Sequence, residues 1–396
     1  MNSFGADTPM RVEIRGGRIL WPDGTIEEGS LAIEGGKIAG PTRATGLCAH
    51  RVIDARGLLV LPGIVDLHGD AFERQIMPRP GVEVSLGVAL QETDLQVVGN
   101  GITTAFHAIT WSWEPGLRGR EMAYRLRDAI TGMKSRLAAD THIHLRHETF
   151  NLGAVDEIID WLAEGSVRLL AFNDHTPDIH ARINTPVRLQ KYAERAHLSV
   201  EDFTALLRRV WERRGEVPDA NRRLARAAAK ARIASASHDD ESALMRQQFH
   251  ALGCGISEFP KTVEAAQAAC DLGDPIVLGA PNVMRGGSHN GSIGATPMIE
   301  QGLCQILASD YYYPALLHAA FRLAREGVLP FHRAWALISA NPASAAGMTD
   351  RGSIRPGARA DFVLVDDEQP ALPRVMATIV AGRPVFQATR QLAAGF

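Results

Sequence analysis

LVLPGIVDLHGDAFERQ, residues 59–75, joins an apolar run to a histidine and an aspartate that one glycine separates. The apolar run is typical of a strand that is buried on both faces. His68 and Asp70 follow it directly, and imidazole nitrogens and carboxylate oxygens are ligands of divalent metals. We interpret the pair as metal ligands at the end of a buried strand. Gly69 is expected to leave room for the backbone to turn away.

Length and composition limit the classes of protein that fit. The chain has 396 residues, enough for a barrel of about 250 residues and a smaller unit. A hydrophobic content of 45% and a charged content of 22% are typical of a globular protein. The net charge of −3 predicts no basic surface for nucleic acid, and no apolar run approaches the ~20 residues that span a membrane.

Two further features predict a cytoplasmic protein. The four cysteines lie far apart without a CxxC pair, which is typical of reduced thiols. The first residues, MNSFGADTPMRVEI, contain no apolar segment of the kind that begins a signal peptide.

Both ends of the sequence have the pattern of short β-strands. Residues 10–58 alternate apolar and polar side chains between GG, PDG and GG turns, and residues 352–386 repeat this pattern. We therefore expect one small β-sandwich, built from residues 1–58 and 350–396. Residues 59–349 are then a separate domain inserted between its two halves.

The middle of the chain alternates strands with helices. Apolar strand-like runs occupy residues 61–68, 101–108, 142–148, 167–175, 232–240, 255–260, 275–281 and 305–312. Amphipathic segments lie between most of them, which predicts an α/β fold and, with eight strands, a TIM-like (β/α)₈ barrel. Residues 176–230 are long for one connection, and we expect a helical cap there.

Candidate metal ligands lie where these strands end. In barrels of this class the reactive groups lie at the carboxyl ends of the strands. Six such residues have metal-binding side chains: His68, Asp70, Glu148, His175, His238 and Asp310. Any one of them is more often a hydrogen-bonding histidine or a helix cap. Six at the same end of successive strands favour a divalent metal, with zinc first and manganese or iron as alternatives.

The number of metal ions, one or two, is left open by the sequence. A bound metal lowers the pKa of its water from ~15.7 toward ~7, and Asp310 is the candidate base for that proton. Alternation along residues 142–148 places Glu148 and His147 on opposite faces of their strand. If Glu148 points into the barrel, His147 faces the helices.

A glycine-rich stretch, GAPNVMRGGSHNGS at residues 279–292, follows the seventh strand. Its backbone N–H groups, hydroxyls and arginine suit a phosphate group, and barrel phosphate sites commonly follow strands seven and eight. A flexible loop and solvated helix faces are the alternatives. The candidate substrate-binding residues are Arg79, Lys191, Arg285, Gly286, Gly287, Ser288 and His289.

The sequence resembles the amidohydrolase superfamily. VIDARGLLVLPGIVDLH, NPASAAG and GSIRPGARADFVLV carry that resemblance. A closer one, to the diphosphatases of the carbon–phosphorus lyase pathway, covers essentially the whole chain. It is carried by LHGD, MPRPGV, HLRHE, NDHTP, ASHDDE, EFPKTVEAA, GAPNVMRGGSHNG and ASDYYYPALLHAAFR, and residues 234–322 are its most specific part.

The resemblance implies a hydrolase that converts α-D-ribose 1-methylphosphonate 5-triphosphate to the 5-phosphate and diphosphate. It also implies that His68, Asp70, Glu148, His238 and Asp310 are metal ligands by position, to which we add His175. The chain departs from the wider superfamily in three places. Asp70 replaces the second histidine of the first strand, no lysine ends the fourth strand, and the sixth strand, GISEFP, lacks a histidine.

Two other functions fit the sequence. Most of the superfamily hydrolyses C–N bonds, so a deacylase or deaminase is the alternative enzyme. A barrel without a metal could also act as a scaffold. The expected partner is a small phosphorylated substrate, with no nucleic acid or membrane, and a homo-oligomer is left open.

Overall fold

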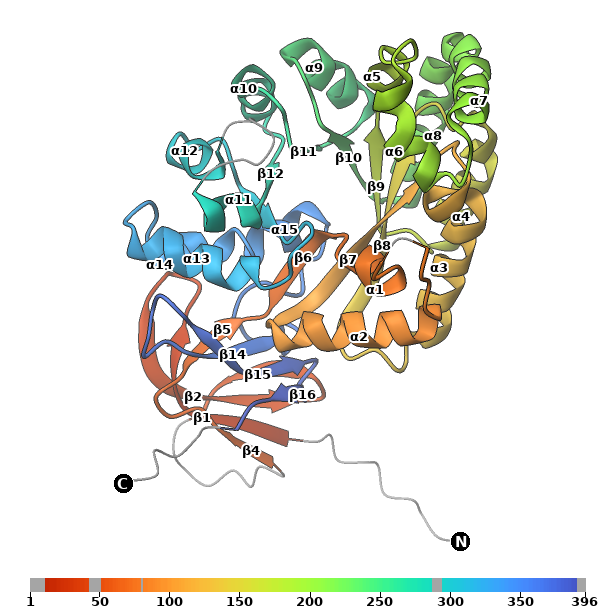
Figure 1. Cartoon of the computed structure of the whole chain (residues 1–396). Helices are drawn as coiled ribbons and strands as arrows, with labels where there is room; N and C mark the ends of the chain where they lie inside the picture. Colours follow the sequence, from red (N-terminus) through yellow and green to blue (C-terminus); the bar gives the residue numbers. More distant parts are fainter. Residues whose placement is uncertain (1–10, 43–50, 80, 287–293, 390–396) are drawn as a thin grey trace, which may run out of the picture.

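The computed structural model describes residues 11–42, 51–79, 81–286 and 294–389. Two sheets organise them, a parallel barrel with helices around it and a second sheet built from both ends of the chain (Figure 1). Within the described residues, no helix is both long enough and apolar enough to span a membrane.

The barrel confirms the predicted (β/α)₈ architecture. Its strands pair in chain order, every neighbouring pair is parallel, and a bridge from Gly69 to Asp310 joins the last strand to the first. The strands are β6 (Ile64–Gly69), β7 (Ile102–Trp111), β8 (Asp140–Glu148), β9 (Leu169–Asn173), β10 (Ala234–His238), β11 (Ile256–Glu258), β12 (Ile276–Gly279) and β13 (Ile306–Ala308).

Helices follow the strands, as a parallel barrel requires. In α4 the buried residues Val155, Ile158 and Leu162 recur at helical spacing, so one stripe packs on the barrel. The helices are α1 (Phe72–Ile76), α2 (Leu86–Gly99), α3 (Arg120–Met133), α4 (Val155–Glu164), α5 (Thr176–His180), α6 (Pro186–Arg195), α7 (Val200–Glu212), α8 (Val217–Ala231), α9 (Ala243–Leu252), α10 (Val263–Asp271), α11 (Ala280–Arg285), α12 (Ala295–Glu300), α13 (Ala315–Arg325), α14 (Phe331–Ala336) and α15 (Ala340–Ala345).

The long connection between β9 and β10 contains four helices, α5 to α8. Ser199 caps α7 by accepting a hydrogen bond from the Asp202 N–H. Leu189, Phe203 and Leu207 belong to a separate small apolar cluster in this segment. The connection is therefore an ordered helical unit beside the carboxyl ends of the strands (Figure 1).

The second sheet joins the two ends of the chain, as the sequence predicts. Its path is β16-β15-β14-β5-β1-β2-β3, with β4 beside β1. The edge strand β3 also meets the segment before β14, where the Ile38 N–H donates to the Ala358 carbonyl. The strands are β1 (Arg11–Leu20), β2 (Ile26–Glu34), β3 (Lys37–Pro41), β4 (Arg51–Asp54), β5 (Leu59–Pro62), β14 (Phe362–Asp366), β15 (Arg374–Val380) and β16 (Arg383–Gln387).

The predicted strand at residues 61–68 is split between the two sheets. β5 pairs with β1 and β14 in the terminal sheet, and the barrel strand β6 begins only at Ile64. The break falls at Gly63, where an added Cβ would lie 2.2 Å from the Thr103 Oγ1. The absence of a side chain there lets the chain pass from one sheet to the other.

Candidate metal centre

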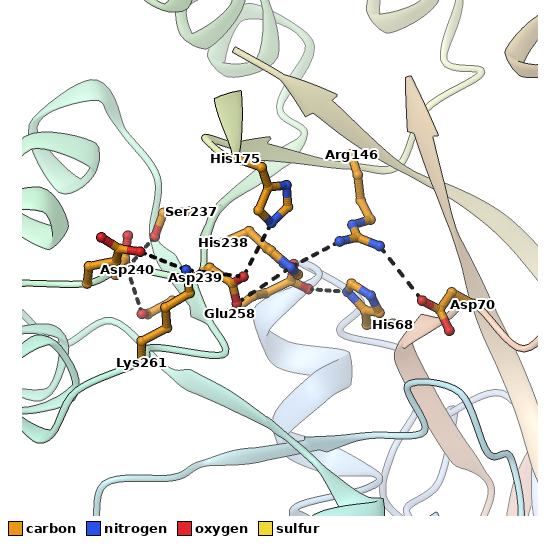
Figure 2. A network of polar contacts seen from close by, with 12 residues as sticks. His68, Asp70, Arg146, His175, Ser237, His238, Asp239, Asp240, Glu258 and Lys261 are labelled. Atoms are coloured by element: carbon orange, nitrogen blue, oxygen red, sulfur yellow. Dashed lines mark hydrogen bonds and ion pairs between the residues drawn. The ribbon is translucent and has the colours of Figure 1, made fainter. Parts of the chain in front are cut away.

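The carboxyl ends of the barrel strands bring together imidazoles, carboxylates and one guanidinium (Figure 2). Three groups of side chains lie close enough to share a cation, because one ligand atom from each member is within 4.8 Å of the others. The groups are His68, His144 and Glu258; His68, Asp70 and Asp310; and His175, His238 and Asp239.

A bulge at the end of β6 turns His68 into the barrel. Val65 and Leu67 belong to the apolar cluster inside the barrel, so simple alternation would place His68 on the helix side. The pairing with β7 shifts register between Asp66 and Gly69, and an extra residue on one strand re-aims the following side chain. The His68 Nδ1 then lies 3.2 Å from the Glu258 Oε1.

Gly69 is required by packing rather than by a turn. A Cβ at this position would lie 2.9 Å from the Asp66 Oδ2 and 2.9 Å from the Tyr313 Cε1. Asp66 is buried, and it accepts hydrogen bonds from the N–H and hydroxyl of Ser309 at 3.0 and 2.5 Å. The glycine therefore lets the ends of β6 and β13 meet, which corrects the expectation that it only frees the backbone.

Asp310 lies beside the pair from β6. Its N–H donates to the His68 carbonyl and its carbonyl accepts from the Asp70 N–H, each at 2.9 Å. Its φ of 54° is unusual for a residue other than glycine, and such backbone is held only where its surroundings enforce it. Burial and the nearby Asp70 raise the pKa of the Asp310 carboxyl to about 7.

Glu258, at the end of β11, contacts three imidazoles. Its two carboxylate oxygens lie 3.2 Å from the Nδ1 atoms of His68 and His238, and one lies 3.7 Å from the His144 Nε2. The sequence analysis did not select Glu258, because it sought a histidine in the sixth strand. The available signal was an acid at the end of a buried strand, where the other ligands also lie.

The third group surrounds His175. Its Nδ1 lies 2.6 Å from the Glu148 Oε1, and its Nε2 lies 3.3 Å from the Asp239 Oδ2. Burial opposes the charged imidazole, but Glu148 and Asp239 outweigh it and raise the pKa of His175 to about 9. Asp239 also lies 3.8 Å from the Lys261 Nζ. Asp239 is not among the ligands predicted from the sequence, and its φ of 62° depends on its surroundings in the fold.

Arg146 separates the second and third of these groups (Figure 2). Its Nη2 lies 3.0 Å from the His238 Nε2, and its Nη1 lies 3.8 Å from the Asp70 Oδ2. The side chain is 6% exposed, so its charge acts in a poorly hydrated environment. His238, which the sequence predicts as a metal ligand, thus has one ring nitrogen beside Arg146 and the other beside Glu258.

The protonation of the site fits a divalent cation. Burial and the Arg146 charge lower the pKa of His68 to about 3, and burial lowers the pKa of His144 to about 4. These imidazoles are neutral at neutral pH, the form that binds metals. The Asp310 carboxylate has no hydrogen bond or ion pair within the described ranges, and a cation beside it would favour its ionised form. His68, Asp70 and Asp310 thus offer a nitrogen and two carboxylates, and of the two acids only Asp70 has an ion-pair partner in the described residues, Arg146 at 3.8 Å.

A cavity of about 260 Å³ adjoins Glu148 and His175. Its other lining residues come mainly from the segment after β7 and from α5 and α6. Four are basic: Arg118, Arg182, Lys191 and Arg195. Of the predicted substrate-binding residues that the structure describes, only Lys191 lines this cavity.

The other predicted substrate-binding residues lie elsewhere or outside the described residues. Arg79 forms a short bridge with Val82 and does not line this cavity. Arg285 ends α11, and it and Gly286 are exposed. Gly287, Ser288 and His289 lie outside the described residues. The predicted substrate-binding set, Lys191 included, therefore stays a prediction.

Comparisons with known proteins agree with this architecture. N-isopropylammelide isopropylaminohydrolase from Burkholderia multivorans ATCC 17616 superposes with a TM-score of 0.64 at 18% identity, covering 95% of this chain and 98% of that one. At that identity the likeness shows the fold alone. A profile described as "Amidohydrolase family" matches residues 285–386.

Sequence relatives identify the class. A protein from Escherichia coli (strain K12) is 34% identical over 355 residues, which cover 86% of this chain and 91% of that protein. The chain belongs to the amidohydrolase family. The E. coli relative is named alpha-D-ribose 1-methylphosphonate 5-triphosphate diphosphatase. A shorter match, 43% identical over 83 residues, is to an adenine deaminase from Methylobacterium nodulans and covers 21% of this chain and 14% of that protein.

Proposed function

We propose that this protein hydrolyses α-D-ribose 1-methylphosphonate 5-triphosphate to the corresponding 5-phosphate and diphosphate. The observation that carries the proposal is the 34% identity to the E. coli diphosphatase over nearly the whole of both chains. The four basic residues in the cavity beside the candidate metal centre support an anionic substrate.

We assign the primary metal site to His68, Asp70 and Asp310, whose side chains form one of the groups able to share a cation. Glu148 and His238, also predicted as ligands, lie with Asp239 around the neighbouring group. His175 is predicted as a ligand too, but Glu148 and Asp239 favour its protonated form, which does not bind a metal, so we assign it to the substrate instead. Zinc suits the mixture of nitrogen and oxygen ligands, with manganese or iron as alternatives. When bound, the metal supplies Lewis acidity and lowers the pKa of water toward ~7.

Asp310 acts as the general base. The oxygen of the attacking water forms a bond to the phosphorus nearest the ribose, and the bond from that phosphorus to the bridging oxygen of diphosphate breaks. The water proton passes to the Asp310 carboxylate, and the electron pair of the broken bond leaves with diphosphate. Because burial and Asp70 favour protonation of Asp310, this carboxyl is suited to receive a proton near neutral pH.

Arg146 and His175 supply fixed positive charge. Arg146 carries a permanent charge between Asp70 and His238, and Glu148 and Asp239 keep His175 protonated at neutral pH. Charges fixed in a buried site stabilise a phosphoryl group as negative charge spreads over its oxygens. We therefore propose that both residues stabilise the transition state of phosphoryl transfer.

Hydrolysis of a C–N bond is the alternative, and the short deaminase match favours it over one-fifth of the chain. Diphosphate release from a panel of ribose 5-triphosphates, with and without a 1-phosphonate, tests the leading proposal. We expect the phosphonate-bearing compound to react with the highest kcat/KM. Turnover of amides or aminopyrimidines, with no diphosphate release, would favour the alternative.

A further inference from the structure

The cavity beside His175 has a lining that the metal site does not explain. Its basic residues come from two separate parts of the chain. Arg118 lies between β7 and α3, whereas Arg182, Lys191 and Arg195 lie within or next to α6. Glu148 and His175 also line the cavity, so it adjoins the third group of the candidate metal centre, which contains His175.

Two of the four cations have no acidic partner among the described residues. The Arg182 Nη1 donates to the Tyr192 hydroxyl at 3.1 Å. The Lys191 Nζ lies 4.8 Å from the centre of the Tyr192 ring. Tyr192 therefore holds both side chains at the wall of the cavity without neutralising either charge, and both remain available to an anion.

The other two cations are only partly satisfied. The Arg195 Nη2 lies 2.5 Å from Oε1 of the buried Glu114, and the Arg118 Nη2 lies 3.3 Å from the Glu73 Oε2. In both side chains, however, Nε is buried and makes no hydrogen bond within the described part of the chain. A buried N–H without a partner is costly, so a ligand that accepts hydrogen bonds in this cavity would satisfy it.

We propose that this cavity binds the diphosphate part of the substrate, the part that leaves. This inference rests on the proposed function and adds where the diphosphate part of the substrate is bound. The cavity is lined by four basic residues and three acids, and one of the acids, Glu148, is bonded to His175. The four cations therefore outnumber the two remaining acids, Glu114 and Asp178. A surplus of positive charge suits the multiply charged diphosphate better than a phosphonate ester with one negative charge.

The position of the cavity agrees with this orientation. Glu148 and His175 belong both to the cavity wall and to the network that Arg146 joins to Asp70, so a phosphoryl group bound beside Arg146 would lie next to the cavity. Two further phosphoryl groups would extend from there toward Arg182 and Lys191. The ribose and its phosphonate would then lie on the other side of the reacting phosphorus.

Competitive inhibition by inorganic diphosphate tests the assignment. In the full-length, metal-loaded enzyme, Arg182→Met and Lys191→Met are each expected to raise the inhibition constant of diphosphate about tenfold, since each removes a charge-assisted contact. The matched control is Arg188→Met, which removes an exposed cation from the same helix outside the cavity. The control should change the constant by less than about twofold, as expected for an exposed charge.

A second inhibitor distinguishes the two ends of the substrate. Inhibition by methyl phosphonate esters should change little in either cavity variant. A selective loss of inhibition by the ester would place the opposite end in the cavity and overturn the assignment. Equal diphosphate inhibition of wild type, Arg182→Met and Lys191→Met would also overturn it, provided that their melting temperatures agree.

The test separates this inference from the proposed function. Absence of diphosphate release by the wild type would refute the function itself. Normal diphosphate release by the wild type, with an unchanged KM for the substrate in both cavity variants, would refute only the proposal that the diphosphate part is bound in this cavity.

Discussion

Arginine, histidine and aspartate side chains meet at both ends of strand β8, but their charges are paired differently at the two ends. At the amino end, the Arg351 Nη1 bonds to the Asp140 Oδ2 at 2.7 Å and to the Thr104 hydroxyl at 2.9 Å, and His142 lies 3.3 Å from the same carboxylate oxygen. At the carboxyl end, Arg146 lies between Asp70 and His238.

The difference lies in which charges are neutralised. The acid at the amino end of β8, Asp140, has a cationic partner in Arg351. At the carboxyl end, Asp310 has no bonded partner within the described residues, and the pKa of its carboxyl is raised to about 7 by burial and Asp70. A buried carboxylate without a bonded partner, among other possible ligands, is therefore better evidence of a functional site than the mere presence of histidine and aspartate.

The largest effect is expected from Asp310→Asn. Asparagine keeps the shape of the side chain but cannot accept the proton of the attacking water. We expect a folded protein whose turnover falls by about 10³-fold or more. Diphosphate release and the melting temperature measure the two properties separately. Turnover near the wild-type value would show that Asp310 is not the base.

Gly69→Ala should disturb the metal site through packing. The added Cβ would lie 2.9 Å from atoms of Asp66 and Tyr313, so β6 must shift and displace His68 and Asp70. We expect metal affinity to fall about tenfold or more, as when groups that orient ligands are lost. Gly132→Ala in α3 is the control, because nothing lies within 4 Å of its added Cβ. Equal affinities in both variants would refute the packing argument.

Asp140→Asn tests the opposite end of the barrel. Burial opposes ionisation of Asp140, but His142 and Arg351 outweigh it and hold the pKa of the carboxyl well below its usual range. Loss of the charge leaves Arg351, which is largely buried, without this partner, and the free energy of unfolding should fall by about 3 kcal/mol. Chemical denaturation measures this change. Metal content should stay as in the wild type, and its loss would mean that the two ends are not independent.

The smallest effect concerns His147. Burial lowers the pKa of this histidine to about 4, and neither ring nitrogen has a hydrogen-bond partner among the described residues. The unfolded state, with a pKa near 6.5, binds the proton first on acidification, so stability is lost as pH falls from about 6.5 toward 4.

His147→Phe should remove this contribution. Below pH 6.5 the free energy of unfolding should depend less steeply on pH, by up to about 1.4 kcal/mol per pH unit. Denaturation at pH 7.5 and pH 5 checks the prediction. The two proteins should be similar at the higher pH, and an unchanged slope between the two pH values would count against a neutral His147.

Much of the fold could be predicted because strand periodicity is local information. All eight barrel strands lie where apolar runs end in polar residues, and His147 packs beside Phe172 in the helix-side cluster, as alternation predicts. The split at Gly63 could not be predicted, because it depends on the close approach of Thr103, which is distant in sequence.

The site was predictable only in part, because some of its contacts join residues that are distant in the sequence. His68, Asp70 and Asp310 come together because they end neighbouring strands of a closed barrel. The role of Glu258 depends on three imidazoles from other strands, and the position of Arg146 depends on contacts across the barrel. Neither follows from spacing along the chain. The cavity cations come from separate connections whose packing has no local signature.

Metal content measured by elemental analysis tests the central claim most directly. Wild type and the Asp70→Asn/Asp310→Asn double variant would be loaded with zinc, freed of unbound metal and compared at equal protein concentration. We predict at least one bound ion per chain in the wild type and one fewer in the double variant. A wild type without metal, or a double variant with the same content, would contradict a cation site at His68, Asp70 and Asp310.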